Sequence, residues 1–129
     1  MECCYYCGDG CNGGYLYQSW NYWKKRGIVT GGLYNDTATC KPYAFEPCAH
    51  HVHSKKYKDC PGGEYNTPSC KRHCNPKYGK EYNDDRIYGK SVYSVQEEHY
   101  MMKELVTNGP FEVAISVYAD FVTYKKGVY

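Results

Sequence analysis

The 129-residue sequence predicts an α+β fold, because helical and strand-like patterns occupy separate parts of the chain. Residues 15–26 have the spacing of an amphipathic helix. Residues 31–88 have no sustained period but contain five of the nine cysteines. Residues 111–117 alternate as a half-buried strand does. A helix-plus-loop half followed by a β-rich half indicates an α+β protein that stops during its second part.

The first helix is predicted from its apolar face and its C-terminal stop. Leu16, Trp20 and Trp23 recur on one side, and Gly27 follows the last periodic residue. We expect both tryptophans to lie in the core rather than to stack on a ligand.

A second helix and two strands are predicted nearer the C-terminus. Ser94-Val-Gln-Glu97 resembles a capping box that opens a helix of about a dozen residues, and Asn108-Gly-Pro110 would end it. The strand pattern then has Phe111, Val113, Ile115 and Val117 alternating with Glu112, Ala114, Ser116 and Tyr118. Residues 127–129 would lie in the middle of another strand.

Composition restricts the functional class and the compartment. The net charge of +2 gives no strong electrostatic signal for nucleic acid or an anionic membrane, and no apolar run is long enough to span a bilayer. Nine cysteines indicate an oxidising compartment, either lysosomal or secreted. Asn35-Asp-Thr37 is an N-glycosylation pattern that fits this compartment. Because no signal-peptide pattern is present, we expect an internal piece of a longer precursor.

The segment Cys7-Gly-Asp-Gly-Cys11-Asn-Gly-Gly-Tyr15 contains two cysteines and four glycines just before the first helix. Cross-linked glycine backbone can form a rigid ledge without side chains, which would bind an extended peptide through main-chain hydrogen bonds. The alternative is a cross-linked turn with no ligand.

Histidines gather in Cys48-Ala-His50-His51-Val-His53, upstream of Cys60. One interpretation is a zinc site built from these five cysteine and histidine side chains, although adjacent histidines on extended backbone point to opposite sides. A second is an exposed loop closed by a Cys48–Cys60 disulfide, with solvated histidines. In a third, that loop faces a cleft, and imidazoles that are cationic in an acidic compartment bind a carboxylate.

Taken together, these segments resemble the cathepsin B branch of the papain-like cysteine proteases, from Cys3 to Tyr129. The matching motifs are Cys3-Cys4, the glycine-rich segment 7–15, Trp20-Asn-Tyr-Trp23, Gly31-Gly-Leu-Tyr34, Cys48-Ala-His-His-Val52, Tyr88-Gly89, Tyr93-Ser-Val95, Asn108-Gly-Pro110, Ser116-Val-Tyr118 and Lys126-Gly-Val-Tyr129.

The resemblance implies an incomplete papain-like two-domain fold. Residues 1–89 would form part of the helical domain, with an occluding loop at 48–60, and residues 90–129 would start the β-barrel domain. The backbone of Gly13 and Gly14 would pair with substrate. Tyr15, Leu16 and Ala114 would border the S3 and S2 pockets, although Leu16 stands where the family often has proline. His50 and His51 would bind the substrate's C-terminal carboxylate, and His53 would be solvated.

The same resemblance implies a disulfide pattern. The pairs would be Cys3–Cys70, Cys4–Cys7, Cys40–Cys74 and Cys48–Cys60, with Cys11 bound to a cysteine upstream of residue 1. The catalytic cysteine, histidine and asparagine match no residue of this chain, so the chain alone is expected to be inactive.

The predicted function is therefore that of a fragment of a cysteine endopeptidase and dipeptidyl carboxypeptidase. Its partners would be peptide or protein substrates, its own propeptide and cystatin-like inhibitors, and it would need no metal and no cofactor. A secreted disulfide-rich interaction module and a zinc-binding domain are the alternatives.

Overall fold

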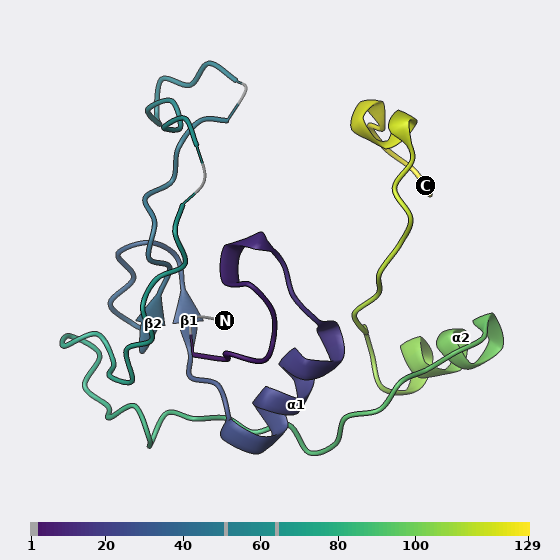
Figure 1. Cartoon of the computed structure of the whole chain (residues 1–129), viewed down its shortest axis with the longest axis horizontal. Coiled ribbons are helices and arrows are strands. Elements are labelled where there is room, and N and C mark those ends of the chain that lie inside the picture. Colours follow the sequence, from purple (N-terminus) through teal and green to yellow (C-terminus); the bar gives the residue numbers. More distant parts are fainter. Residues whose placement is uncertain (1–2, 51, 64) are drawn as a thin grey trace. The chain divides into compact units, whose positions relative to one another are not determined.

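Two units, Met1–Val92 and Tyr93–Tyr129, make up the computed structural model, which describes residues 3–50, 52–63 and 65–129. The first contains η1 (Gly10–Asn12), α1 (Leu16–Arg26), β1 (Gly31–Gly32) and β2 (Lys41–Pro42) (Figure 1). The second contains α2 (Glu98–Thr107) and η2 (Ala119–Thr123). In the described part of the chain, no helix has the length and apolar character needed to cross a membrane.

Helix α1 ends at Gly27, the stop that the sequence predicts. Gly27 has a φ of 72°, a conformation that glycine adopts without strain, and its N–H donates to the Trp23 carbonyl at 2.9 Å. The Trp23 indole N–H donates to the Ile87 carbonyl at 2.9 Å. Trp20 and Trp23 contact each other, with ring centroids 5.3 Å apart, but both are only half-buried. The prediction that they lie in the core is therefore wrong, since no residue of α1 is buried.

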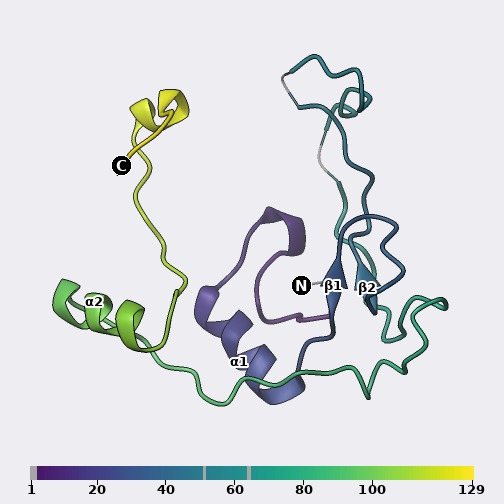
Figure 2. The same cartoon turned by 180° about the vertical axis from the view of Figure 1, so that it is seen from behind.

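Strands β1 and β2 form a short parallel pair, with Gly31 opposite Lys41 and Gly32 opposite Pro42. They lie side by side when viewed from the front and from behind (Figures 1 and 2). The Tyr43 N–H donates to the Gly32 carbonyl at 2.9 Å, which extends the pairing by one residue. This pair fixes the point from which the chain continues toward residue 48.

Disulfides take the place of an aliphatic core in the first unit. The buried residues among those described are Cys4, Cys7, Gly27, Cys40, Ala49 and Asp85. The cross-links are Cys3–Cys70, Cys4–Cys7, Cys40–Cys74 and Cys48–Cys60, the same pairs that the resemblance implies. Cys11 is exposed and carries a free thiol. Cross-links of this kind stabilise small domains whose cores are too small to do so alone.

In the second unit, α2 begins three residues later than a Ser94 cap would require. The residue that precedes the helix is Glu97, which has a φ of 67° and makes no side-chain capping hydrogen bond. This left-handed turn interrupts the path from Ser94 into the helix, so the capping-box prediction is wrong. The C-terminal end agrees with the sequence, because the Asn108 N–H closes the last turn on the Glu104 carbonyl at 2.8 Å.

The strand predicted at residues 111–117 is absent, and so is the strand predicted at 127–129. Val113, Ile115 and Val117 are 56%, 61% and 61% exposed. An alternating segment becomes a strand only when another strand accepts its hydrogen bonds and covers its apolar face. The described residues of this unit supply no such partner.

Candidate functional site

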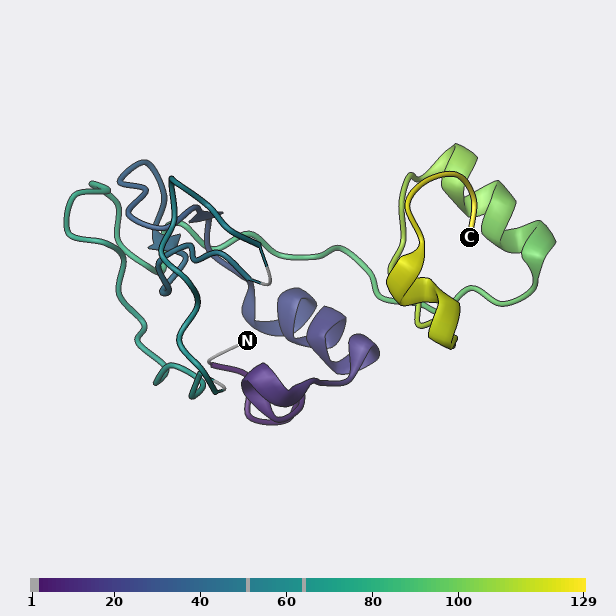
Figure 3. The same cartoon turned by 90° about the horizontal axis from the view of Figure 1, so that it is seen from above.

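The glycine ledge, residues 8–14, is a backbone hairpin held by hydrogen bonds at both ends. The Asp9 N–H donates to the Gly13 carbonyl at 2.9 Å, and the Tyr15 N–H donates to the Cys7 carbonyl at 2.6 Å. Gly8 and Gly14 form an antiparallel bridge so close that a Cβ on Gly8 would lie 2.2 Å from the Gly14 Cα. Figure 3 shows this segment beside α1. The turn is thus well defined without side chains between its arms.

The outer side of the ledge is open. A Cβ on Gly13 would meet no atom within 4 Å, and Gly13 and Gly14 are both exposed. An approaching peptide would therefore meet bare backbone at this position, where main-chain hydrogen bonding is sterically allowed. Tyr15 and Leu16 follow directly, as the residue that precedes α1 and its first residue, and both side chains are exposed.

A hydrogen bond joins the ledge to the segment that returns from the histidine region. The Cys11 N–H donates to the Thr67 hydroxyl at 2.9 Å, although the two residues are 56 positions apart. Gly10 lies so close that a Cβ there would be 1.9 Å from the Thr67 Oγ1. The Cys3–Cys70 disulfide links the chain just before the ledge to the chain just after Thr67 covalently. The structure therefore brings the ledge and this returning segment together.

The histidine loop, residues 48–60, is closed at its base by the Cys48–Cys60 disulfide, with a Cα–Cα distance of 4.9 Å. Backbone hydrogen bonds reinforce the closure: the Ala49 N–H donates to the Lys58 carbonyl at 2.7 Å, and the Cys60 N–H donates to the Ala49 carbonyl at 3.0 Å. His50 and His53 line a hollow of about 730 Å³ at this loop. His51 lies outside the described residues.

The charge of the histidine loop favours an anionic ligand. Its sequence contains three lysines and one aspartate, so its formal charge is +2 even with all of its histidines neutral. The lysines are Lys55, Lys56 and Lys58, and the carboxylate is Asp59.

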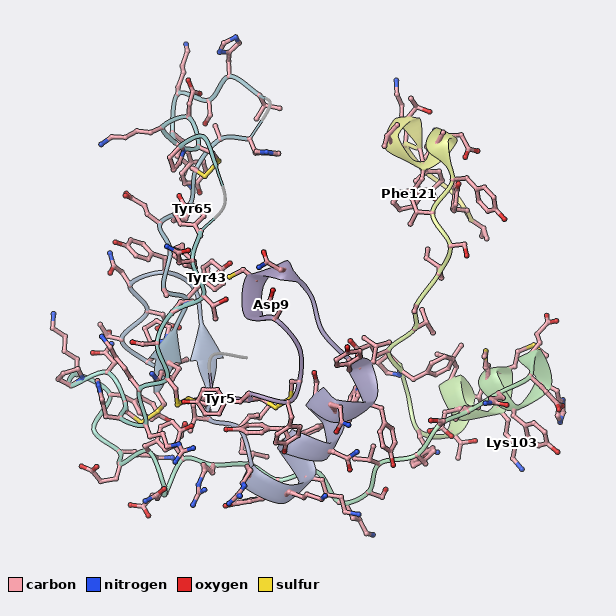
Figure 4. The ribbon with its side chains drawn as sticks, in the orientation of Figure 1. Tyr5, Asp9, Tyr43, Tyr65, Lys103 and Phe121 are labelled. Atoms are coloured by element: carbon pink, nitrogen blue, oxygen red, sulfur yellow. A yellow bond between two sulfur atoms is a disulfide. The ribbon has the colours of Figure 1, made fainter. Side chains whose placement is uncertain are left out.

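Aromatic rings join the two arms of the stem, residues 43–47 and 61–67, that carries the loop. Phe45 packs against Tyr65 with ring centroids 4.5 Å apart, and against Tyr43 at 5.9 Å. Figure 4 shows Tyr43 and Tyr65 on this stem below the loop. Because Phe45 precedes the loop and Tyr65 follows it, the ring pair is a second closure outside the disulfide.

A buried carboxylate lies at the root of the stem. Asp85 is 5% exposed and accepts hydrogen bonds from the Tyr78 hydroxyl at 2.5 Å, the Thr30 N–H at 2.8 Å and the Thr30 hydroxyl at 2.7 Å. Donation by Tyr78, then by Thr30, lowers the pKa of Asp85 below its ordinary value, although burial opposes the shift and Lys80 adds a small favourable charge. We call Thr30, Tyr78 and Asp85 the Asp85 latch.

The other predicted site residues lie at exposed positions. Asn35, the glycosylation position, is exposed and has a φ of 62°, and Thr37 of the same motif is also exposed. Ala114 is exposed in the second unit. The structure thus groups the ledge with the stem and the histidine loop, and it describes Ala114 within a separate unit.

The zinc hypothesis loses two of its ligands. Cys48 and Cys60 form a disulfide with each other, so neither sulfur can be the thiolate that zinc requires. Among the described residues, no group of three histidine, cysteine or acidic side chains could hold a metal ion.

Thr67, Tyr65 and Asp85 belong to the site region, but the sequence did not reveal them. Each acts through a partner distant in the chain or across the loop, and none belongs to a local motif. A buried aspartate in an otherwise charged segment, Asp84-Asp85-Arg86, carries no periodic signal that separates it from its exposed neighbour.

The ledge, the disulfide-rich framework and the histidine loop fit one class of protein, a thiol protease. The sequence matches the papain family of cysteine proteases over residues 1–129. It is 45% identical to cathepsin B-like cysteine proteinase 6 of Caenorhabditis elegans, 44% to a cathepsin B-like cysteine proteinase of Schistosoma japonicum and 42% to cathepsin B-like cysteine proteinase 5 of C. elegans.

The chain belongs to the papain family of cysteine proteases. Each alignment covers 100% of this chain but only 35%, 38% and 39% of these three relatives, so the chain spans little more than a third of their length. The predicted family and its incomplete α+β fold are confirmed by this match. The four disulfides fit the oxidising compartment that the cysteine content predicts.

Proposed function

We propose that this chain is the central part of a cathepsin B-like cysteine peptidase that cleaves peptide bonds within proteins and also releases dipeptides from C-termini. The observation that carries the proposal is the joining of an open glycine ledge to the stem that carries a closed histidine loop of net positive charge. Thr67 and the Cys3–Cys70 disulfide make this connection. The ledge would hold the substrate backbone, and the loop would limit how far the substrate extends.

The ledge would bind the part of the substrate before the scissile bond. Gly13 and Gly14 are exposed, and the main-chain groups not used by the hydrogen bond from Asp9 would pair with an extended peptide in the manner of an added strand. Tyr15 and Leu16 would border the adjacent side-chain pockets, and Ala114 would contribute from the second unit. Since Leu16 is flexible where proline is rigid, we expect a broader pocket at this position.

The histidine loop would bind the other end of the substrate. His50 and His51 would donate charge-assisted hydrogen bonds to the terminal carboxylate, two residues beyond the bond to be cut. The net positive charge of the loop supports this assignment, because it attracts an anion before any specific contact forms. His53 also lines the hollow but would remain solvated.

The chemical step would need groups that this chain does not match. We propose that a thiolate nucleophile, its imidazole base and an orienting asparagine lie elsewhere in a longer polypeptide, and that Cys11 pairs there with another cysteine. The propeptide of this longer polypeptide and cystatin-like inhibitors would bind where the substrate binds, along the ledge and the histidine loop. We propose a lysosomal or secreted location, with an N-linked glycan on Asn35.

The test compares two substrates in the full-length protease. One fluorogenic peptide carries a free C-terminal carboxylate and the other is amidated. We expect His50→Ala and His51→Ala to lower kcat/KM for the free-acid peptide by about 10–100-fold, the range for lost charged hydrogen bonds. The amidated peptide should be cleaved at a similar rate by all variants. His53→Ala is the matched control, and equal losses on both peptides would contradict the carboxylate role.

A further inference from the structure

The Asp85 latch is the most completely bonded polar cluster that the proposed function leaves without a role. A carboxylate that is only 5% exposed costs free energy unless donors surround it, and Asp85 accepts hydrogen bonds from three. The donors come from residues 55 and 7 positions away in the sequence. The latch therefore adds a buried polar connection between two segments that the Ile28–Ile87 backbone hydrogen bonds also join.

One side of the latch leads to the outgoing arm of the stem. The Thr30 hydroxyl, which donates to Asp85, also accepts from the Cys40 N–H at 3.1 Å. The Thr30 carbonyl accepts from the Lys41 N–H at 3.0 Å, directly at the start of β2. From β2 the chain continues through the stem into the histidine loop. The position of Thr30 therefore determines where this arm begins.

The other side leads to the returning arm. Cys40 is fully buried, forms its disulfide with Cys74 and accepts a hydrogen bond from the Asn75 N–H at 2.7 Å. Cys74 lies a short distance after the segment that descends from the loop. Both arms are therefore attached to Cys40, whose N–H is oriented by the hydroxyl that Asp85 holds.

We propose that Asp85 is a positioning residue for the histidine loop: by holding Thr30, it fixes the root from which the loop presents His50 to the substrate's carboxylate. This inference rests on the proposed function. Asp85 touches no substrate and acts through Thr30, Cys40 and β2. A displacement of the root by a fraction of an ångström is transmitted by the stem, which the Phe45–Tyr65 contact keeps closed.

The first test uses Asp85→Asn in the full-length protease, with Asp84→Asn as the matched control. Asp84 is the exposed neighbour, so its substitution removes the same charge without disturbing the latch. For Asp85→Asn we expect kcat/KM on the free-acid peptide to fall about ten-fold, mainly through KM, because ligand orientation is lost. Cleavage of the amidated peptide should change less than about two-fold.

Hydrogen exchange gives a readout that does not depend on activity. In Asp85→Asn, the amides of Cys40, Lys41 and Asn75 should exchange faster, while Asp84→Asn leaves them unchanged. Thr30→Val, which lacks the hydroxyl, should reproduce both the loss of activity on the free-acid peptide and the faster amide exchange. Thr30→Ser keeps the hydroxyl, so its activity and exchange should match those of the unsubstituted protein. If Asp85→Asn fails to fold, Thr30→Val and Tyr78→Phe provide the same test.

Three results would overturn either the positioning role of Asp85 or the proposed carboxypeptidase function. Equal losses on both peptides would mean that Asp85 serves general stability, and the positioning role would be rejected. Unchanged exchange at the three amides would reject the latch itself. Absence of dipeptide release by the unsubstituted protease would reject the proposed carboxypeptidase function, and this result is independent of the exchange experiment.

Discussion

Residues 3–92 and residues 93–129 are stabilised in different ways. The first region has little regular secondary structure, yet it contains all four disulfides and the long-range hydrogen bonds of Thr30, Thr67 and Trp23. The second has a helix and an alternating, strand-like pattern but no cysteine. Its side-chain hydrogen bonds join residues close in sequence, such as that from the Tyr129 hydroxyl to Asp120 at 2.9 Å.

This difference shows that regular patterning and a defined tertiary structure are separate properties. An irregular segment becomes well defined when cross-links and buried polar contacts join it to distant parts of the chain. A regular strand pattern remains an exposed extended segment when the partner strand is missing. The following changes test this conclusion, beginning with the largest expected effect.

Removal of the Cys40–Cys74 disulfide should have the largest effect on the first region. We expect Cys40→Ser with Cys74→Ser to lower the free energy of unfolding by about 2–5 kcal/mol, since this bond constrains the unfolded chain and places a buried sulfur at the root of the stem. Denaturant unfolding of the full-length protein would measure the loss. Cys48→Ser with Cys60→Ser is the comparison, because it opens a shorter, exposed loop and should cost about 1 kcal/mol less on chain entropy alone.

The contact between the ledge and Thr67 should be the next most sensitive feature. Gly10→Ala would place a Cβ 1.9 Å from the Thr67 Oγ1 at a residue whose φ is 55°. We expect a loss of about 1–3 kcal/mol in the free energy of unfolding, because the ledge must move or strain its backbone. Gly62→Ala, at a position with no atom within 4 Å, should change stability by less than about 0.5 kcal/mol. Equal effects would show that the Thr67 contact does not constrain the ledge.

The Asp85 latch should make the free energy of unfolding of the first region depend on pH. The Tyr78 and Thr30 donors lower the pKa of Asp85 in the folded protein. Its stabilising contribution is therefore fully present above the unfolded value of about 3.9 and is lost as pH falls through the lower, folded value.

Unfolding of the unsubstituted protein and of Asp85→Asn at pH 6, 5, 4 and 3 would measure this contribution. The difference between them should stay constant from pH 6 to 5 and shrink below about pH 4. Asp84→Asn should show no comparable change, because Asp84 is exposed. A difference that grew as pH fell would contradict the direction of the pKa shift.

The smallest effect is expected in the second region. Because Ile115 is 61% exposed, Ile115→Ala in the 129-residue chain should alter the free energy of unfolding by less than about 0.5 kcal/mol. In a full-length protease that supplies a partner strand, the same change should cost about 2–5 kcal/mol, as a buried Ile→Ala substitution does. Amide exchange over residues 111–117 should slow in the longer protein, and unchanged exchange would contradict the strand interpretation.

Features that depend on interactions between neighbouring residues could be predicted from the amino-acid sequence. Helix α1 and its Gly27 stop were predictable, because helical hydrogen bonds join residues four positions apart and glycine tolerates the positive φ. The turn-forming glycines were also visible as a motif. The order of the motifs indicated the papain-like cysteine proteases, and the family match over residues 1–129 confirms this prediction.

Contacts between residues distant in the chain could be identified from the folded structure but not from sequence patterns. Thr67 contacts the ledge across 56 positions, and Thr30 contacts Asp85 across 55. Such pairs leave no periodic signal, because a hydroxyl or a carboxylate can be satisfied by many partners, including water. The absent strand at 111–117 has the same physical cause: β-structure is a property of two paired segments, and one segment's alternation cannot supply the other.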